Sequence, residues 1–133
     1  MRVFLDTNVL VSAFATRGLC ADVLRHVLAK HDLVLGETVL AELRRALRER
    51  LHMPRGAIDD IEGFLRGYEV VPKPMRPSSI PVRDPDDAWI LSSAVDARAN
   101  VLVSGDRGLL TLGTKSPIRI QTPREFWSAE RGK

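Results

Sequence analysis

The chain has 133 residues, the size of one ordinary domain, and 44% of them are hydrophobic, which is enough for one continuous core. The formal net charge of +3 permits nucleic-acid binding but does not require it. The single cysteine, Cys20, cannot form an intrachain disulfide. Asp6 and Asn8 interrupt the apolar start of the chain, so we expect this segment to be neither a signal peptide nor a membrane span. We expect one cytoplasmic domain over residues 1–133.

Short apolar segments alternate with helical patterns along the chain. In order, the pattern predicts a strand at 3–5, helices at 9–14 and 21–28, a strand at 33–35, helices at 37–51 and from 54 through 65, a strand at 68–71, a helix at 84–98, a strand at 101–103, a short helix through 109–110, an edge strand at 118–120 and a last helix from 122 through 127. Short strands without polar alternation are typical of a parallel sheet covered by helices. The sequence therefore predicts an α/β fold, in which ligands bind at the carboxyl ends of the strands.

Two aspartates follow predicted strands. Asp6 comes directly after the first strand, and Asp106 follows the strand at 101–103 by three residues. Both are therefore expected at the carboxyl edge of the sheet. Taken singly, each has an equally good interpretation as an ordinary N-cap of the helix that follows, because Asp is a favoured N-cap residue.

A third aspartate lies on a core-facing stripe. At about 100° per residue, Asp87 shares its face of the helix with Ile90 and Leu91. Burying an unpaired carboxylate is costly, so Asp87 is predicted to have a function. Asp86 is expected to face the other way into solvent. Asp84 is either the N-cap of this helix or a supporting acid of the site.

Glu42 lies beside the apolar arc of its helix and completes a set of four acids. By itself it could be a rim glutamate that is solvated or loosely paired with Arg45 on the next turn. Together, several acids in one crevice would repel each other and raise one another's pKa. A hard divalent cation removes this conflict, and Mg²⁺ or Mn²⁺ prefers such oxygen ligands. The sequence thus predicts a metal site formed by Asp6, Glu42, Asp87 and Asp106.

Other sites have little support in the sequence. The histidines, His26, His31 and His52, are scattered and show no metal-ligand spacing with cysteine. There is neither a glycine-rich phosphate loop nor a Gly-x-Ser-x-Gly motif. A phosphatase or receiver-like domain also uses acids at strand ends, but Thr7-Asn8 follows Asp6 where the phosphatase needs a second Asp, and the receiver's lysine is missing.

Four segments of the chain resemble the successive motifs of the PIN domain family. They are FLDTNVLVSAF at the start, AEL around Glu42, RDPDDAWILSSA and VLVSGDRGLL, and together they span most of the chain in order. Within the family, the chain is most similar to bacterial and archaeal toxins of toxin–antitoxin pairs, the VapC-like group. The resemblance implies a three-layer α/β/α sandwich with a mainly parallel central sheet.

The resemblance also implies a function. It makes Asp6, Glu42, Asp87 and Asp106 the catalytic and metal-binding acids of a Mg²⁺- or Mn²⁺-dependent endoribonuclease, and it makes Asn8 and Ser104 supporting residues. Asp84 and Asp86 lie close to the third acid, where helix phase favours Asp87, and we treat Asp84 as a supporting residue. It implies single-stranded RNA as substrate, products with 5′-phosphate and 3′-hydroxyl ends, a small cognate antitoxin protein as partner, and a homodimer that uses the helices between Glu37 and Tyr68.

Two alternatives stay open. A PIN-like scaffold could bind RNA or protein without cutting, and its acids could then hold a metal for structural reasons. The arginine-rich stretch from Arg44 to Arg55, and the cations Lys73, Arg76 and Arg83, fit an RNA backbone path equally as well as a solvated helix face. Trp89 and Trp127 are expected to pack rather than to stack on bases.

Overall fold

The structure, a computed structural model, describes residues 1–132 and is built on a parallel five-stranded sheet. The strands lie in the order β3-β2-β1-β4-β5, and every neighbouring pair is parallel. Their bounds are β1 Arg2–Leu5, β2 Asp32–Gly36, β3 Glu69–Val71, β4 Val101–Val103 and β5 Arg119–Gln121. Successive strands are placed on one side of β1 and then on the other, so the order reverses between β1 and β4.

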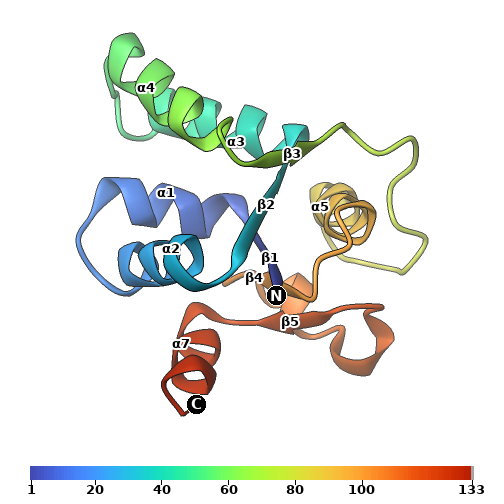
Figure 1. Ribbon diagram of the computed structural model, residues 1–133. Coiled ribbons are helices and arrows are strands. Elements are labelled where there is room, and N and C mark those ends of the chain that lie inside the picture. The colour runs from blue at the N-terminus through green and yellow to red at the C-terminus, as the bar shows by residue number, and fades with distance from the viewer. Residues whose placement is uncertain (133) are drawn as a thin grey trace.

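Helices cover both faces of this sheet, with α1, α2 and α7 on one side and α5 on the other (Figure 1). Their bounds are α1 Thr7–Ala15, α2 Leu19–Lys30, α3 Glu37–Glu49, α4 Arg55–Leu65, α5 Pro85–Asp96, α6 Arg107–Leu110 and α7 Pro123–Arg131, with a short 3₁₀ helix at Gly113–Lys115. The predicted fold class, a mainly parallel sheet between helices, is confirmed, and the elements follow in the predicted order.

The central strands form because their side chains are apolar on both faces. Val3, Phe4 and Leu5 of β1 and all of Val101–Val103 of β4 are fully buried, as expected for strands between two helical layers. α5 approaches β2 closely at Gly36, where a Cβ atom would lie only 3.2 Å from the Cβ of Ser93. The glycine therefore lets α5, with its acids, lie against the end of the sheet.

The helix starts agree with the capping residues in the sequence. The side chain of Asp84 accepts a hydrogen bond from the backbone N–H of Asp86 at 2.9 Å, and Pro85 occupies the first turn. Thr122 and Glu125 form a reciprocal capping box at α7. α1 begins at Thr7, two residues before the predicted start, because Asp6 caps it.

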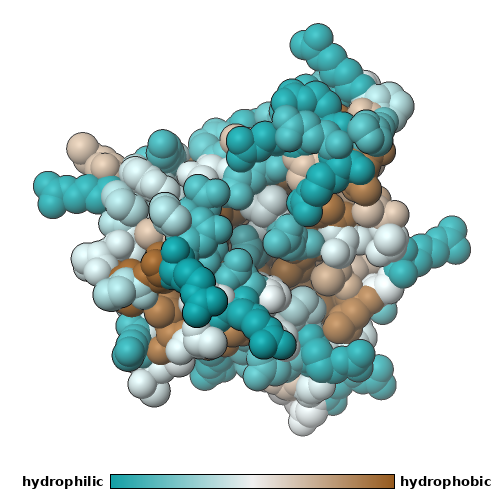
Figure 2. Space-filling view, turned by 180° about the vertical axis from the view of Figure 1, so that it is seen from behind, coloured by the Kyte–Doolittle hydropathy of each residue, from teal (hydrophilic) through white to brown (hydrophobic). Residues whose placement is uncertain are grey.

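The surface opposite to that of Figure 1 is mainly hydrophilic, and hydrophobic residues show there as separate patches (Figure 2). Cys20 is half-buried and packs against the edge of the core, in agreement with a hydrophobic role. Among the helices of residues 1–132, none combines the length and the apolar character needed to cross a bilayer.

Candidate active site

Asp6 and Asp106 lie where the strand order reverses. Asp6 follows the last residue of β1, and Asp106 follows β4 after Ser104 and Gly105. β1 and β4 are neighbours, and Leu5 pairs with Val103 at their carboxyl ends. Crevices at such a switch point are the usual ligand sites of open parallel sheets. The topology therefore brings these two carboxylates, 100 residues apart in the sequence, to one position.

Asp6 is buried and held at both carboxylate oxygens. Its Oδ1 accepts from the backbone N–H of Thr7 at 2.7 Å, and its Oδ2 accepts from the Ser104 hydroxyl at 2.7 Å. The Ser104 Oγ in turn accepts from the backbone N–H of Asp106 at 3.0 Å. Ser104 is fully buried, so this small polar network fixes the carboxylate of Asp6 against the end of β4.

Asp106 is the N-cap of α6. Its Oδ1 accepts from the backbone N–H groups of Gly108 at 2.7 Å and Leu109 at 3.3 Å. Both Asp6 and Asp106 are thus N-caps, as the alternative interpretation required, and both also line the pocket. Capping and a place in the site are therefore compatible, because the cap does not use Asp106 Oδ2, and each oxygen of Asp6 has a further lone pair.

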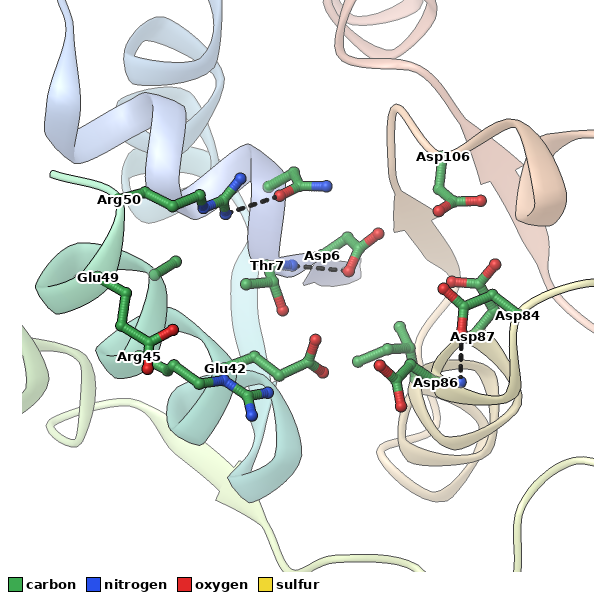
Figure 3. Close-up of a pocket in the computed structure, with 13 residues that line it drawn as sticks. Asp6, Thr7, Glu42, Arg45, Glu49, Arg50, Asp84, Asp86, Asp87 and Asp106 are labelled. Atoms are coloured by element: carbon green, nitrogen blue, oxygen red, sulfur yellow. Dashed lines mark hydrogen bonds between the residues drawn. The ribbon is translucent and has the colours of Figure 1, made fainter.

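Asp87 comes from the first turn of α5 and is buried with 6% of its surface exposed. Its Oδ2 has no hydrogen-bond partner among the described residues. Asp84 caps the same helix and lines the same pocket. Asp86 is exposed, but it also lines the pocket, and Figure 3 shows it on the side of Glu42. The prediction that Asp86 faces away from the site was wrong, because consecutive residues of the first turn spread around the open end of the pocket.

Glu42 reaches the pocket from α3, across the pocket from the acids at the start of α5 (Figure 3). Its Oε1 is buried and, within residues 1–132, accepts no hydrogen bond. The alternative pairing with Arg45 does not occur as an ion pair in the described chain, although the charge of Arg45 lowers the pKa of Glu42. Burial and the charges of Asp6 and Asp86 outweigh it.

The acids share one open pocket, which we call the acid pocket, with a volume of about 250 Å³. Figure 3 shows the carboxylates of Asp84, Asp87 and Asp106 on one side, the arginines on the opposite side, and Asp6 and Glu42 between them. The residues that line it are Asp6, Thr7, Asn8, Glu42, Arg45, Ala46, Glu49, Arg50, Asp84, Asp86, Asp87, Ile90 and Asp106. Asn8 accepts from Arg50 at 3.3 Å at the rim.

The pocket disfavours its own negative charge. Burial raises the pKa of Asp87 to about 7, and the neighbouring charges of Asp106, Asp84 and Asp6 add to the shift. Burial raises the pKa of Glu42 to about 7 as well, with the charges of Asp6 and Asp86 next in importance. The pKa of Asp6 is raised by burial in spite of its hydrogen bonds. These carboxylates need a positive partner that the described chain does not supply.

A divalent cation fits this arrangement. Glu42 Oε1 and Asp87 Oδ2 are buried oxygens without a partner in residues 1–132, and both residues line the acid pocket. A Cβ atom at Gly108 would lie 2.9 Å from Asp87 Oδ2 and 3.0 Å from Asp106 Oδ1, so the glycine keeps the space before these oxygens open. An all-oxygen donor set of this kind suits Mg²⁺ or Mn²⁺.

Some residues behave differently from what the sequence predicted. Arg44, one of the cations for which an RNA contact and a solvated helix face were left open, has its guanidinium bound to Asp59 and Glu62 of α4. Thr7 was missed, although it lines the pocket and its buried hydroxyl lacks a partner within residues 1–132. Its place directly after the first acid could have indicated it.

The histidines are not all scattered. His26 Nε2 and His31 Nε2 lie 2.9 Å and 2.6 Å from the same oxygen of Glu130 on α7, near the amino ends of the strands. Ligand atoms of the three residues lie within 4.8 Å of one another. Since Glu130 Oε1 accepts from both rings, the group joins α2 to α7 at the sheet edge opposite to the acid pocket. The sequence concealed it because Glu130 is 99 residues from His31.

Comparison with known proteins agrees with this fold. A family model described as PIN domain matches residues 2–108, whereas no curated protein sequence matches the chain. The solved structures similar to this one include VapBC2 from Rickettsia felis bound to a promoter DNA fragment and FitAcB from Neisseria gonorrhoeae, each with 16% identity, a TM-score of 0.61, and coverage of 92% of this chain and 98% of the other.

VapBC-1 from nontypeable Haemophilus influenzae is similar at 18% identity with a TM-score of 0.62, over 93% of this chain and 99% of that chain. At such identities the likeness shows a shared fold, and family membership comes from the match to 107 of the 133 residues. The chain belongs to the PIN domain family, a family of nucleases.

Proposed function

We propose that this protein is a Mg²⁺- or Mn²⁺-dependent endoribonuclease and the toxin of a toxin–antitoxin pair. The observation that carries the proposal is the convergence of Asp6, Glu42, Asp87 and Asp106 on the acid pocket, with two buried carboxylate oxygens left without a partner in the described chain. A scaffold without a cation would gain stability by losing these acids, since unpaired buried carboxylates are costly. Their presence supports a function that requires them.

The four acids would hold the cation, and the remaining residues keep them in position. Bound there, a divalent cation lowers the pKa of a water molecule and stabilises charge on a phosphate. Ser104 and the Thr7 N–H orient Asp6, while the α6 backbone orients Asp106. Asp84 holds the start of α5, and therefore Asp87, through its cap. Asn8 lies at the rim, where its amide is oriented by Arg50.

RNA is the proposed substrate because cations accompany the acids. Arg45 and Arg50 line the acid pocket on the α3 side, where they can contact phosphates of a strand that enters it. Arg45 is exposed and forms no ion pair in residues 1–132, in contrast to Arg44. If water attacks the phosphorus in line and the 3′-oxygen leaves, as the family resemblance implies, the products carry 5′-phosphate and 3′-hydroxyl ends.

The proposed protein partners are a small antitoxin and a second copy of the chain. Structures of similar fold are described as VapBC and FitAB assemblies, and two of them as bound to DNA fragments. On this chain, Phe64 of α4 is 47% exposed and Leu51 after α3 is 41% exposed. Phe64 packs its ring against Tyr68, so the α3–α4 region offers apolar surface for a homodimer contact.

The decisive experiment is cleavage of single-stranded RNA by purified protein with Mg²⁺ or Mn²⁺, with excess chelator, and with Asp6→Asn. We expect cleavage that chelator and Asp6→Asn both abolish, because a neutral amide is a poor ligand for a hard cation. Circular dichroism of Asp6→Asn checks that the fold is kept, since Asn also caps helices well. RNA binding without any cleavage would instead indicate a non-catalytic binding module.

A further inference from the structure

A second charged depression lies next to the acid pocket, and its charge is opposite. This region, which we call the basic hollow, has a volume of about 460 Å³ and is lined by Pro81, Val82, Arg83, Arg107, Gly108, Thr111, Leu112 and Lys115. It contains three cationic side chains and no acidic one. Such a concentration of one sign of charge at a concave surface attracts ligands of the other sign.

The three cations are not neutralised by the protein. Within residues 1–132, the side chains of Arg83, Arg107 and Lys115 form no hydrogen bond and no ion pair, and all three are exposed. Arg44 and Arg66, in contrast, are both bound by carboxylates of α3 and α4. The cations of the hollow are therefore available for an anion that comes from outside.

The hollow and the acid pocket meet at the start of α6. Asp106 lines the acid pocket, whereas the next two residues, Arg107 and Gly108, line the hollow. The same division occurs before α5, where Arg83 lines the hollow and Asp84 lines the acid pocket. Gly108, which lines the hollow, also lies against Asp87 Oδ2, because a Cβ atom there would be only 2.9 Å from this oxygen. A nucleic-acid strand with one phosphate at the acids would therefore continue directly into the hollow.

We propose that the basic hollow binds backbone phosphates of the RNA strand on one side of the scissile bond, while Arg45 and Arg50 contact the strand on the other side. The proposal rests on the proposed function, because it takes RNA as the ligand of the acid pocket. Pro81, Val82 and Leu112 give the hollow an apolar wall, on which a sugar or base can lie. The hollow therefore fits a nucleotide unit better than a free inorganic ion.

The test compares two double variants in the Asp6→Asn background, which we expect to bind RNA without cutting it. Arg107→Gln with Lys115→Gln removes two charges from the hollow. Lys30→Gln with Arg98→Gln is the matched control, because both residues are exposed and precede β2 and β4 at the opposite edge of the sheet. The probe is a short fluorescein-labelled oligouridylate in Mg²⁺ buffer, and anisotropy gives the Kd at several salt concentrations.

Binding of single-stranded RNA weakens with salt in proportion to the phosphates contacted, with a slope of about 0.7 per phosphate in the logarithmic plot. We expect the hollow variant to lose affinity and to reduce this slope by about 0.7 to 1.4, for one or two phosphates lost. The control should keep the slope of the parent protein. Equal effects of the two variants, or no effect of either, would overturn the proposal.

Cleavage by the same double variants with Asp6 intact separates this proposal from the proposed function. Unchanged KM and rate in the Arg107 and Lys115 variant would reject the hollow and leave the ribonuclease in place. If the protein never cuts RNA but still binds it through the hollow in a salt-dependent way, the proposed ribonuclease function is rejected and the role of the hollow is kept. We expect a higher KM with a smaller change in kcat, because these residues hold the strand and not the reacting phosphate.

Discussion

The acid pocket and the basic hollow are neighbours in space and are built from neighbouring residues, yet their charges are opposite. Arg83 and Asp84 precede α5, and Asp106 and Arg107 begin α6, and in each pair one side chain enters each region. A net charge of +3 for the whole chain gives no hint of this separation. At the starts of α5 and α6, neighbouring side chains line different pockets. Their placement, and not the overall composition, puts an acidic site that suits a cation beside a basic one that suits an anion.

The largest expected effect comes from removing a buried charge in the acid pocket. Asp87→Asn should reduce RNA cleavage to background and at the same time raise the metal-free Tm, because the unpaired carboxylate that it replaces is costly to bury. Differential scanning fluorimetry with and without Mn²⁺ measures the second effect. Wild type should be stabilised by Mn²⁺ and the variant much less. A lower metal-free Tm for the variant would contradict the inference that the buried carboxylate of Asp87 destabilises the metal-free protein.

Gly108 lies between the acid pocket and the basic hollow, and Gly108→Ala adds a single methyl group there. Gly108→Ala would place a Cβ atom 2.9 Å from Asp87 Oδ2 and 3.0 Å from Asp106 Oδ1, closer than such atoms normally approach. The carboxylates must then shift, and we expect cleavage to fall by about 10- to 100-fold, as for other disturbances of residues that orient metal ligands. Gly105→Ala is the matched control, because nothing lies within 4 Å of its Cβ position. Equal cleavage activity of the two variants would show that the free space at Gly108 is not needed for cleavage.

Much of this arrangement could be predicted from the sequence. The apolar runs Val3–Leu5 and Val101–Val103 are short and without polar alternation, which fixes them as inner parallel strands and places Asp6 and Asp106 at one edge. Asp87 stood out because its helical phase conflicts with its charge. The predicted positions of these strands and acids agree with the structure, because each depends on local periodicity and on the general geometry of parallel sheets.

The rest depends on contacts between distant segments. Arg44 and Arg45 are adjacent and alike in sequence, but Asp59 and Glu62 of α4 bind only the first. Nothing local predicts that Arg107 and Lys115 share a hollow with Arg83, or that Glu130 accepts from His26 and His31. Such groups arise from how the helices pack, which a single sequence does not show.

The stability of the metal-free protein should depend on pH in an unusual direction. The pKa values of Glu42 and Asp87 are raised to about 7 in the folded protein, above their ordinary values of 4.5 and 3.8. At pH values between the ordinary pKa and the raised pKa, the folded state keeps protons that the unfolded state has lost. The free energy of unfolding therefore falls as the pH rises through this range. We expect a lower Tm at about pH 7.5 than at about pH 5.5 without metal, and a recovery with Mg²⁺. A metal-free Tm that rises over this interval would contradict the prediction.

The smallest expected effect concerns Asp86, whose exposed carboxylate lies on the Glu42 side of the pocket. Its charge is one of those that raise the pKa of Glu42, so Asp86→Asn should lower that pKa and make Glu42 easier to ionise. Because Asp86 is exposed and water screens its charge, the effect on stability should stay below about 1 kcal/mol. Cleavage should remain close to that of wild type, with its activity in Mg²⁺ retained at a slightly lower pH. The pH profile of cleavage for wild type, Asp86→Asn and Asp60→Asn measures this, and Asp60 is the control because it is an exposed acid of α4 outside the pocket. Complete loss of cleavage in Asp86→Asn would mean that this residue, and not Asp87, supplies the acid of α5 to the site.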